Sequence, residues 1–378
     1  MATKIMKVAL VHDYLKEYGG AERVLEALHK IWPKAPVFTS FVDWAWVSKN
    51  KKEWLSWKII PSWFDKLPFK RQFCSPLRFL APWIWENFNL KDFDLVISSS
   101  AWFMCKGVIT HPGSVHICYC HTPPRYLYGY PESAGEKGWL ARQYGRMVNP
   151  LMRYYDFVTS QRVDYFLCNS FNVQKRIAKF YRREATVIYP PINTIKQLNN
   201  ETMKQTKNNY YLMVNRLVWP KRVDLGILAC KKLGLNLKIV GEGKAEEKLR
   251  QLAGNDPHIE FLGYVDDRKL AKVYQGCKAV LYLAQEEDFG ITPLEAASHG
   301  KPVIALRSGG VLEAVVEGKT GFFFDKPEVS QLIKAIKKCD NTSIKTTDCL
   351  RQAKKFSEER FTKEIRKYVG AQHDAPGL

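Results

Sequence analysis

The sequence lacks the features of a membrane-spanning or exported protein. No stretch approaches the roughly 18 apolar residues that a spanning helix needs. The apolar run near the N-terminus, Val8 to Val11, is too short for the core of a signal peptide, and no small-residue cleavage site follows it. We therefore expect a cytoplasmic protein without a spanning helix.

A disulfide or zinc framework is also missing. The nine cysteines form no CxxC pair, and an odd number without an export signal indicates free thiols in a reducing compartment. Cys118, Cys120 and His121 are close in sequence, but alternation along a strand puts both cysteines on one face. No second ligand pair has the spacing of a zinc site, so we expect no bound metal.

Positive charge is in excess. With 58 Lys+Arg against 38 Asp+Glu, the formal net charge is +20. Such a surplus suits partners that carry phosphate, namely nucleic acid, anionic lipid, or nucleotide and lipid diphosphates. The alternative is a generally basic, solvated surface without a function. A length of 378 residues, 46% of them hydrophobic, is enough for two globular domains.

Short apolar runs alternate with helix-length segments along both halves of the chain. In the first half the expected strands are 7–11, 37–40, 95–98, 115–119, 166–168 and 186–189. An amphipathic helix begins at Ala21. In the second half the expected strands are 211–214, 237–240, 259–262, 279–283 and 302–305, and the expected helices between them are 222–232, 245–253, 269–275 and 293–298.

This alternation predicts an α/β fold with two Rossmann-like domains on parallel sheets, whose ligands bind beyond the carboxyl ends of the strands. Pro190-Pro191 and the polar residues after them predict a linker over 190–209. The predicted domains are therefore residues 1–189 and 210–355, with the cleft between them as the default site.

The segment from Glu286 to Glu295, E-E-D-F-G-I-T-P-L-E, joins a strand end to a helix start. Thr292 could cap this helix, with Pro293 at its first position and Glu295 completing a capping box. Alternatively, the backbone N–H groups of Gly290 and the next residue bind an anion, while a neighbouring carboxylate accepts hydrogen bonds from ribose hydroxyls. These residues alone leave both interpretations open.

The stretch from Glu287 to Val303, E-D-F-G-I-T-P-L-E-A-A-S-H-G-K-P-V, resembles the signature of glycosyltransferase family 4. That family has the GT-B fold, an E-x7-E motif and retention of anomeric configuration. The resemblance implies that Glu295 binds the ribose of a nucleotide-sugar donor and that Glu287 contacts the sugar hydroxyls. The turn that meets the sugar and the phosphates would comprise Phe289, Gly290, Ile291 and Thr292.

Two further segments resemble the family. In N-R-L-V-W-P-K, Arg216 and Lys221 match a clamp for the diphosphate, although an isolated pair would be read as solvated basic residues. In Y-G-G-A-E-R-V, Gly19 and Gly20 match a loop that approaches the donor phosphates. Without the resemblance, two glycines before a helix indicate only a turn.

His121, in C-Y-C-H-T-P-P-R-Y, stands where the family has a histidine that contacts the donor sugar near the reacting carbon. A lone histidine at a strand end is more often structural. On the acceptor side, the resemblance implies Asp13, Tyr14 and Arg125. It also implies that the first domain binds the acceptor, that the second binds the donor, and that a helix at about 356–370 returns to the first domain.

The combination of H-D-Y-L, C-H-T-P and R-L-V-x-x-K-R-V-D is most similar to the mannosyltransferases of O-antigen and exopolysaccharide assembly. This implies transfer of a hexose, best mannose from GDP-mannose, with a UDP-sugar as the alternative donor. The implied acceptor is a saccharide, free or linked to polyprenyl diphosphate. The implied mechanism is a front-face substitution that needs no metal or other cofactor.

Nine of the eleven tryptophans lie between Trp32 and Trp102, and most are interleaved with lysine and arginine over residues 44–88. Aromatic and basic side chains together suit an anionic membrane surface, at the inner face of the cell membrane. The alternative is an aromatic core with basic residues on its rim.

The residues alone also suggest two other classes of protein. The charge and the aromatic stretch could belong to a nucleic-acid-binding protein, but no motif of such proteins is present. The G-x-G at Gly241 to Gly243 could belong to a Rossmann dehydrogenase, but the third glycine is missing.

Overall fold

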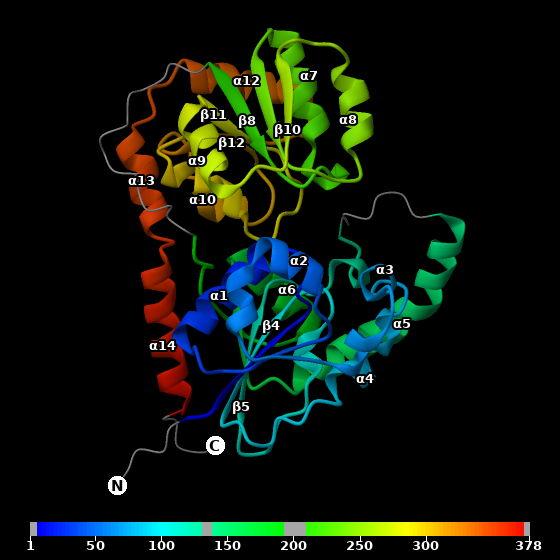
Figure 1. The fold of residues 1–378 in the computed structure, drawn as a ribbon. Coiled ribbons are helices and arrows are strands. Elements are labelled where there is room, and N and C mark those ends of the chain that lie inside the picture. The colour runs from blue at the N-terminus through cyan, green and yellow to red at the C-terminus, as the bar shows by residue number, and fades with distance from the viewer. Residues whose placement is uncertain (1–5, 131–137, 193–208, 374–378) are drawn as a thin grey trace. The chain divides into compact units, whose positions relative to one another are not determined.

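The computed structural model describes residues 6–130, 138–192 and 209–373. These residues form two units: the first holds 6–130, 138–191 and 359–373, and the second holds 192 and 209–358. Each unit is an α/β domain built on its own parallel sheet (Figure 1), which confirms the predicted fold class. Of the predicted linker, residues 193–208 lie outside the described part of the chain.

A seven-stranded parallel sheet forms the centre of the first unit, in the order β3-β2-β1-β4-β5-β6-β7. Its strands are β1 (Val8–His12), β2 (Val37–Thr39), β3 (Ile59–Pro61), β4 (Leu95–Ser100), β5 (Val115–Cys120), β6 (Tyr165–Cys168) and β7 (Ala185–Val187). The sequence did not predict β3, whose apolar run is very short. Its proline suits the edge position that β3 occupies, because proline cannot donate to a neighbouring strand.

Helices cover both faces of this sheet. They are α1 (Gly20–Ile31), α2 (Trp44–Asn50), α3 (Lys70–Phe73), α4 (Ala81–Trp85), α5 (Trp139–Gln161), α6 (Phe171–Tyr181) and α14 (Glu358–His373). Short 3-10 turns lie between them: η1 (Lys52–Ser56), η2 (Trp63–Lys66), η3 (Arg78–Leu80), η4 (Cys105–Gly107) and η5 (Arg125–Leu127).

Alternate strand residues pack on opposite faces, as a doubly covered parallel sheet requires. On one face Leu10 belongs to a core with Leu28 of α1 and Phe361 of α14. On the other face Val11 belongs to a core with Ile84 of α4. The last helix of the chain is therefore part of the first unit.

The aromatic stretch is divided between core and surface. Trp54 and Trp85 are fully buried, and their ring nitrogens donate to Glu26 Oε1 (2.9 Å) and to the carbonyl of Phe103 (2.6 Å). Trp44 and Trp83 are 42% and 63% exposed. The expectation that the stretch forms one membrane-facing surface is therefore wrong for its buried members, which are core residues.

The second unit has a six-stranded parallel sheet in the order β10-β9-β8-β11-β12-β13. Its strands are β8 (Tyr210–Val214), β9 (Asn236–Val240), β10 (Ile259–Gly263), β11 (Ala279–Tyr282), β12 (Val303–Leu306) and β13 (Gly321–Phe324). Its helices are α7 (Val223–Leu233), α8 (Glu246–Ala253), α9 (Asp267–Gly276), α10 (Ile291–Ser298), α11 (Val311–Ala314), α12 (Val329–Asp340) and α13 (Thr346–Lys354), with a 3-10 turn η7 (Trp219–Lys221). Figure 1 shows α7 and α8 on one side of the sheet and α9 and α10 on the other.

The nine cysteines are all buried, and no two of them are bonded to each other. Cys118 and Cys120 lie on one face of β5 and share a core cluster with Cys168, as the strand alternation predicted. Within the described ranges, no helix is both long and apolar enough to cross a membrane.

A buried ion pair fixes α5 to the rest of the first unit. Lys106 of η4 and Asp156 of α5 form a close salt bridge, with side chains 1% and 0% exposed. The carboxylate of Asp156 also accepts hydrogen bonds from the hydroxyls of Tyr128 (2.7 Å) and Tyr181 (3.1 Å). A buried charge needs such partners because burial removes its hydration.

Asp156→Asn should lower the free energy of unfolding by about 3–5 kcal/mol, because it leaves the ammonium of Lys106 buried without a countercharge. Urea unfolding measures this loss. Glu86→Gln is the control, since Glu86 and Arg162 form an ion pair (2.6 Å) whose side chains are 33% and 35% exposed. That pair should contribute at most about 1 kcal/mol. Equal losses in the two variants would contradict a dominant role for the buried pair.

Candidate functional site

The second unit has a topological switch point between β8 and β11. These strands are neighbours in the sheet, and the chain moves outward from them in opposite directions. In such sheets, ligands bind at this point, beyond the carboxyl ends of the strands. The segments that follow β8 and β11 are joined there by a hydrogen bond from the N–H of Gln285 to the carbonyl of Pro220 (3.0 Å).

A cation and a carboxylate meet at this point. Lys221, at the end of η7, forms a close ion pair with Glu287, and their side chains are 19% and 16% exposed. The structure thus brings together the residue predicted to bind the diphosphate and the one predicted to bind sugar hydroxyls. Arg216, in the turn after β8, is exposed. A carboxylate acceptor beside lysine donors can bind hydroxyl and phosphate groups at adjacent positions.

The helix start differs from the predicted capping box. Gly290 is the residue before α10, with φ of 92°, and α10 begins at Ile291, so Thr292 and Pro293 lie inside its first turn. The Thr292 hydroxyl donates to the carbonyl of Val214 at the end of β8 (3.4 Å) instead of capping the helix. The capping box is therefore wrong.

Glu295 also points to a partner other than the helix start. Its Oε2 accepts a hydrogen bond from the hydroxyl of Tyr274 in α9 (2.9 Å). The Tyr274 ring stacks on His299, with ring centroids 5.0 Å apart. No pattern in the sequence points to Tyr274, because only the folded position of α9 beside α10 brings its hydroxyl to the carboxylate. Tyr274 therefore helps to orient Glu295.

The loop that carries Glu287 depends on two glycines that the sequence analysis did not use. A Cβ on Gly309 would lie 2.3 Å from the carbonyl oxygen of Glu287, and one on Gly310 would lie 2.3 Å from that of Asp288. The N–H of Gly310 donates to the carbonyl of Glu287 (2.8 Å). Glu286 has φ of 49°, an uncommon conformation for a residue other than glycine. A strained, over-determined loop of this kind is typical of functional sites.

The G-x-G of Gly241 to Gly243 supports the neighbouring turn. A Cβ on Gly241 would lie 1.9 Å from the carbonyl oxygen of Asn215, and one on Gly243 would lie 2.3 Å from that of Leu217. These glycines follow β9, the second strand of the unit, whereas a dinucleotide fingerprint follows the first strand. The G-x-G is therefore not a dinucleotide-binding fingerprint, and it no longer supports the dehydrogenase alternative.

The first unit has its own switch point, between β1 and β4, and a chain of polar contacts crosses it. Nε2 of His12 lies 3.5 Å from Oε1 of Glu22. Nδ1 of His12 lies 3.1 Å from the Ser99 hydroxyl, which lies 2.8 Å from Nε2 of His121. The other oxygen of Glu22 accepts the N–H of Gly19 (2.8 Å). A predicted phosphate loop and a predicted sugar contact are thus connected through Glu22, His12 and Ser99, which the sequence analysis missed.

The residues predicted for the acceptor side lie in different surroundings. Asp13 is buried, and its carboxylate accepts hydrogen bonds from the N–H groups of three residues in the turn after β4 (2.9–3.0 Å), namely Ala101, Phe103 and Cys105. These bonds favour a structural role for Asp13. Tyr14 is half-buried and donates to Glu17 Oε1 (3.2 Å), and Arg125 is half-buried at the start of η5.

Two sequence profiles match the chain. The profile described as Glycosyltransferase Family 4 matches residues 18–196, and the one described as Glycosyl transferases group 1 matches residues 194–356. The chain belongs to the family-4 glycosyltransferases of the GT-B fold.

Several relatives of this glycosyltransferase have known sequences. An uncharacterised glycosyltransferase of Methanocaldococcus jannaschii is 29% identical over 221 residues, which cover 57% of this chain and 62% of that protein. The α-1,3/1,6-mannosyltransferase ALG2 of Homo sapiens is 27% identical over 287 residues, which cover 66% of each protein. The chain thus spans less than two thirds of the length of these relatives.

Solved structures share the fold of this glycosyltransferase. Anabaena HepE, in complex with UDP and glucose, has a TM-score of 0.71 at 18% identity and covers 97% of this chain and 100% of its own. The lipopolysaccharide outer core galactosyltransferase WaaB has a TM-score of 0.65 at 17% identity, with the same coverage. At 17–18% identity, the similarity to these two structures establishes the fold of this chain and no more.

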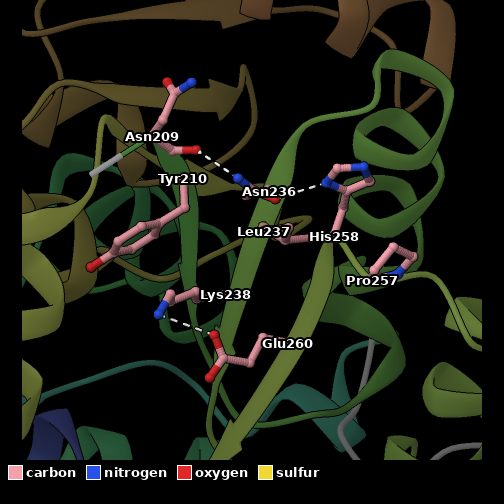
Figure 2. A pocket seen from close by; sticks show the side chains of 8 residues that line it. All are labelled: Asn209, Tyr210, Asn236, Leu237, Lys238, Pro257, His258 and Glu260. Carbon is pink, nitrogen blue, oxygen red and sulfur yellow. Dashed lines mark hydrogen bonds and ion pairs between the residues drawn. The ribbon is translucent and has the colours of Figure 1, made fainter. Parts of the chain in front are cut away.

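One hollow of the glycosyltransferase lies in the second unit, at the end of its sheet opposite the switch point. Figure 2 shows this hollow at the amino ends of β8, β9 and β10. Its volume is about 320 Å³. Its polar side chains are already paired: Lys238 with Glu260 (3.0 Å) and His258 with Asn236 (2.8 Å). Ligands of parallel sheets bind at the opposite end, so we assign no donor contact to this hollow. Among the described residues, no cluster of three His, Cys, Asp or Glu side chains could hold a metal.

His121 is neutral in the folded glycosyltransferase. Burial lowers the pKa of His121 to about 3. A neutral His12 directs its Nε2–H to the carboxylate of Glu22, which can only accept, and its Nδ1 accepts the Ser99 hydroxyl. The Ser99 oxygen then accepts Nε2–H of His121, which leaves Nδ1 of His121 as an acceptor for a ligand hydroxyl.

Ser99→Ala should lower kcat of the glycosyltransferase about five- to tenfold, the effect of one lost hydrogen bond of about 1 kcal/mol that fixes a tautomer. ¹⁵N NMR of the imidazole nitrogens should show His121 changing from the Nε2–H form to a mixture of tautomers.

The matched control is Ser98→Ala, which removes a similar buried bond from Ser98 to His116 (2.9 Å) in the same strand. It should reduce stability and leave kcat and the His121 signals unchanged. Unaltered His121 nitrogen shifts in the Ser99 variant would disprove the tautomer assignment.

Proposed function

We propose that this glycosyltransferase moves a hexose, best mannose from GDP-mannose, from a nucleotide diphosphate sugar to a saccharide acceptor with retention of configuration. The observation that carries the proposal is the Lys221–Glu287 pair at the switch point of the second unit. The names of relatives support it: ALG2 is a mannosyltransferase, and HepE was crystallised with UDP and with UDP-glucose. A UDP-sugar is the alternative donor.

The donor would be held by the second unit through three groups. Lys221 and Arg216 would bind the diphosphate, together with the first N–H groups of α10, which have no acceptor within the helix. Glu287 would accept hydrogen bonds from sugar hydroxyls. Glu295, oriented by Tyr274, would accept them from the ribose.

The proposed reaction is a front-face substitution. The bond between the anomeric carbon and the diphosphate oxygen breaks, and a bond to the acceptor oxygen forms on the same face. The acceptor's proton passes to the departing diphosphate. Negative charge grows on the diphosphate during this step, and the fixed cations stabilise it without a required metal.

Two further features of the proposal concern the acceptor. A saccharide linked to polyprenyl diphosphate would carry both the sugar and the phosphate that a basic protein suits, since the chain has a net charge of +20. Such an acceptor would place the enzyme at the inner face of the cell membrane, in lipopolysaccharide or other polysaccharide biosynthesis.

A thermal-shift panel of GDP-mannose, GDP, UDP-glucose, UDP-galactose and UDP tests the donor. GDP-mannose should raise the Tm most, because a ligand that binds only the folded state stabilises it in proportion to its affinity. A larger shift with a UDP-sugar would select the alternative donor. No shift with any member would contradict nucleotide-sugar binding.

Lys221→Ala should lower turnover about 100-fold or more, the effect of removing one preorganised electrostatic group. Lys221→Arg keeps the charge and should recover part of the activity. Lys232→Ala, an exposed lysine in the last turn of α7, is the matched control and should be as active as the wild type. Turnover within a fewfold of wild type in Lys221→Ala would show that this cation does not act on the diphosphate.

Product NMR and chelation test the mechanism. The anomeric coupling of the product should match that of the donor, and EDTA should leave the rate unchanged because side-chain cations neutralise the leaving group. An inverted product, or a rate lost to EDTA and restored by a divalent cation, would contradict the front-face, metal-independent mechanism.

A further inference from the structure

Helix α5 has one side built into the first unit and another side left uncovered. Met152, Asp156 and Thr159 are buried, and Asp156 is held by Lys106. The remaining circumference of the helix faces outward over most of its length. Residues 139–161 mix apolar, basic and polar residues, so their composition alone does not predict an interaction surface.

The uncovered side is strongly apolar. Six large side chains of α5 are between 40% and 76% exposed: Trp139, Leu140, Met147, Leu151, Tyr154 and Phe157. With about 100° between successive helical residues, these six fall within an arc of about 120°. They lie on one side of the helix and are called the apolar stripe, and large exposed apolar side chains gathered in this way mark an interaction site.

Arginines line one border of this stripe. Arg142, Arg146 and Arg153 are exposed and fall within an arc of about 40° next to Trp139 and Phe157. Among the described residues, none of the three forms an ion pair with a carboxylate, and the only acidic residue of α5 is the buried Asp156. We call the six apolar residues and these three arginines the α5 surface.

A second exposed apolar group lies close to α5. Its members are Phe69, Phe73, Phe79 and Trp83, which are 41% to 70% exposed. Arg78 of η3 joins this segment to α5 through a hydrogen bond to Asn149 (2.9 Å) and lies over the ring of Tyr144 (4.5 Å). Figure 1 shows α3 and α4 beside α5.

We propose that the α5 surface binds the headgroup layer of an anionic lipid bilayer, with the apolar stripe toward the acyl chains and the three arginines on lipid phosphates. A stripe bordered by arginine, with no exposed acid, complements an anionic interface and suits a helix that lies in its plane. Exposed Trp and Tyr side chains favour the same interface. The reason for such binding, access to a lipid-linked acceptor, rests on the proposed function. The binding of the bilayer itself does not depend on transferase activity.

Co-sedimentation of the full chain with vesicles tests the α5 surface. Vesicles of phosphatidylcholine with phosphatidylglycerol should bind it at least tenfold more tightly than phosphatidylcholine alone, and salt should weaken the binding. The triple variant Leu140→Gln, Met147→Gln, Leu151→Gln should lose at least tenfold in partitioning. The triple variant Arg142→Gln, Arg146→Gln, Arg153→Gln should abolish the preference for anionic vesicles.

The matched control replaces three exposed apolar residues elsewhere, Ile109→Gln, Tyr264→Gln and Leu312→Gln, which are 50%, 72% and 46% exposed. It should bind vesicles like the wild type. Equal binding by the α5 and control variants, or no binding by the wild type, would overturn the proposal. So would a dimer in sedimentation velocity that the α5 apolar variant disrupts while vesicle binding is absent, because the occupant would then be a second copy of the chain.

Fluorescence quenching by brominated lipids locates the contact. Trp139→Phe should remove most of the quenching that vesicles cause, whereas Trp44→Phe should leave it unchanged. The reverse result would move the contact to the first part of the aromatic stretch and overturn the role of α5.

The donor thermal-shift panel on the α5 variants separates the two proposals. Unchanged nucleotide-sugar shifts with lost vesicle binding would support the α5 surface. Vesicle binding without any nucleotide-sugar shift would retain the surface and reject the proposed function.

Discussion

Both faces of a parallel sheet must be covered by helices, and this constraint determines where the protein can place side chains that contact a ligand. In each unit the buried strands are largely apolar on both sides, so polar groups that could reach a ligand gather at the strand ends and in the following loops. The two strand orders each contain a switch point, where neighbouring connections diverge and leave the strand ends uncovered. Lys221 and Glu287 meet at one such point, and His12, Ser99 and His121 meet at the other.

The side chains at the two switch points are held in position by neighbouring residues that would not themselves contact a ligand. Glu287 stands on a loop that approaches Gly309 and Gly310 too closely for any other residue there. Glu295 is oriented by Tyr274 from a different helix. His121 is directed by a serine that is itself bonded to a second histidine. In each case a neutral or small group fixes the direction of a residue that could contact a ligand, which is how a site is preorganised.

Aromatic residues serve two purposes in the first unit. Trp54 and Trp85 fill the core and satisfy their ring N–H groups internally, whereas α5 and the segment before α4 keep large apolar side chains outside. The Lys106–Asp156 pair connects these two roles. It holds the buried side of α5 in place and so presents the opposite side of the helix outward.

The sequence by itself determined the fold class, the positions of most strands, and the family, because strand period and the E-x7-E segment are local properties of the chain. It could not decide whether Thr292 caps a helix, because the cap depends on where α10 begins, and tertiary packing places that start at Ile291 after Gly290. The sequence could not distinguish buried from exposed tryptophans, because both kinds lie in the same stretch of aromatic and basic residues. The contacts of Ser99, Tyr274 and Gly309 join residues far apart in the chain, and the outward face of α5 depends on which side of the helix packs against distant residues such as Lys106. Only the folded structure brings those residues together.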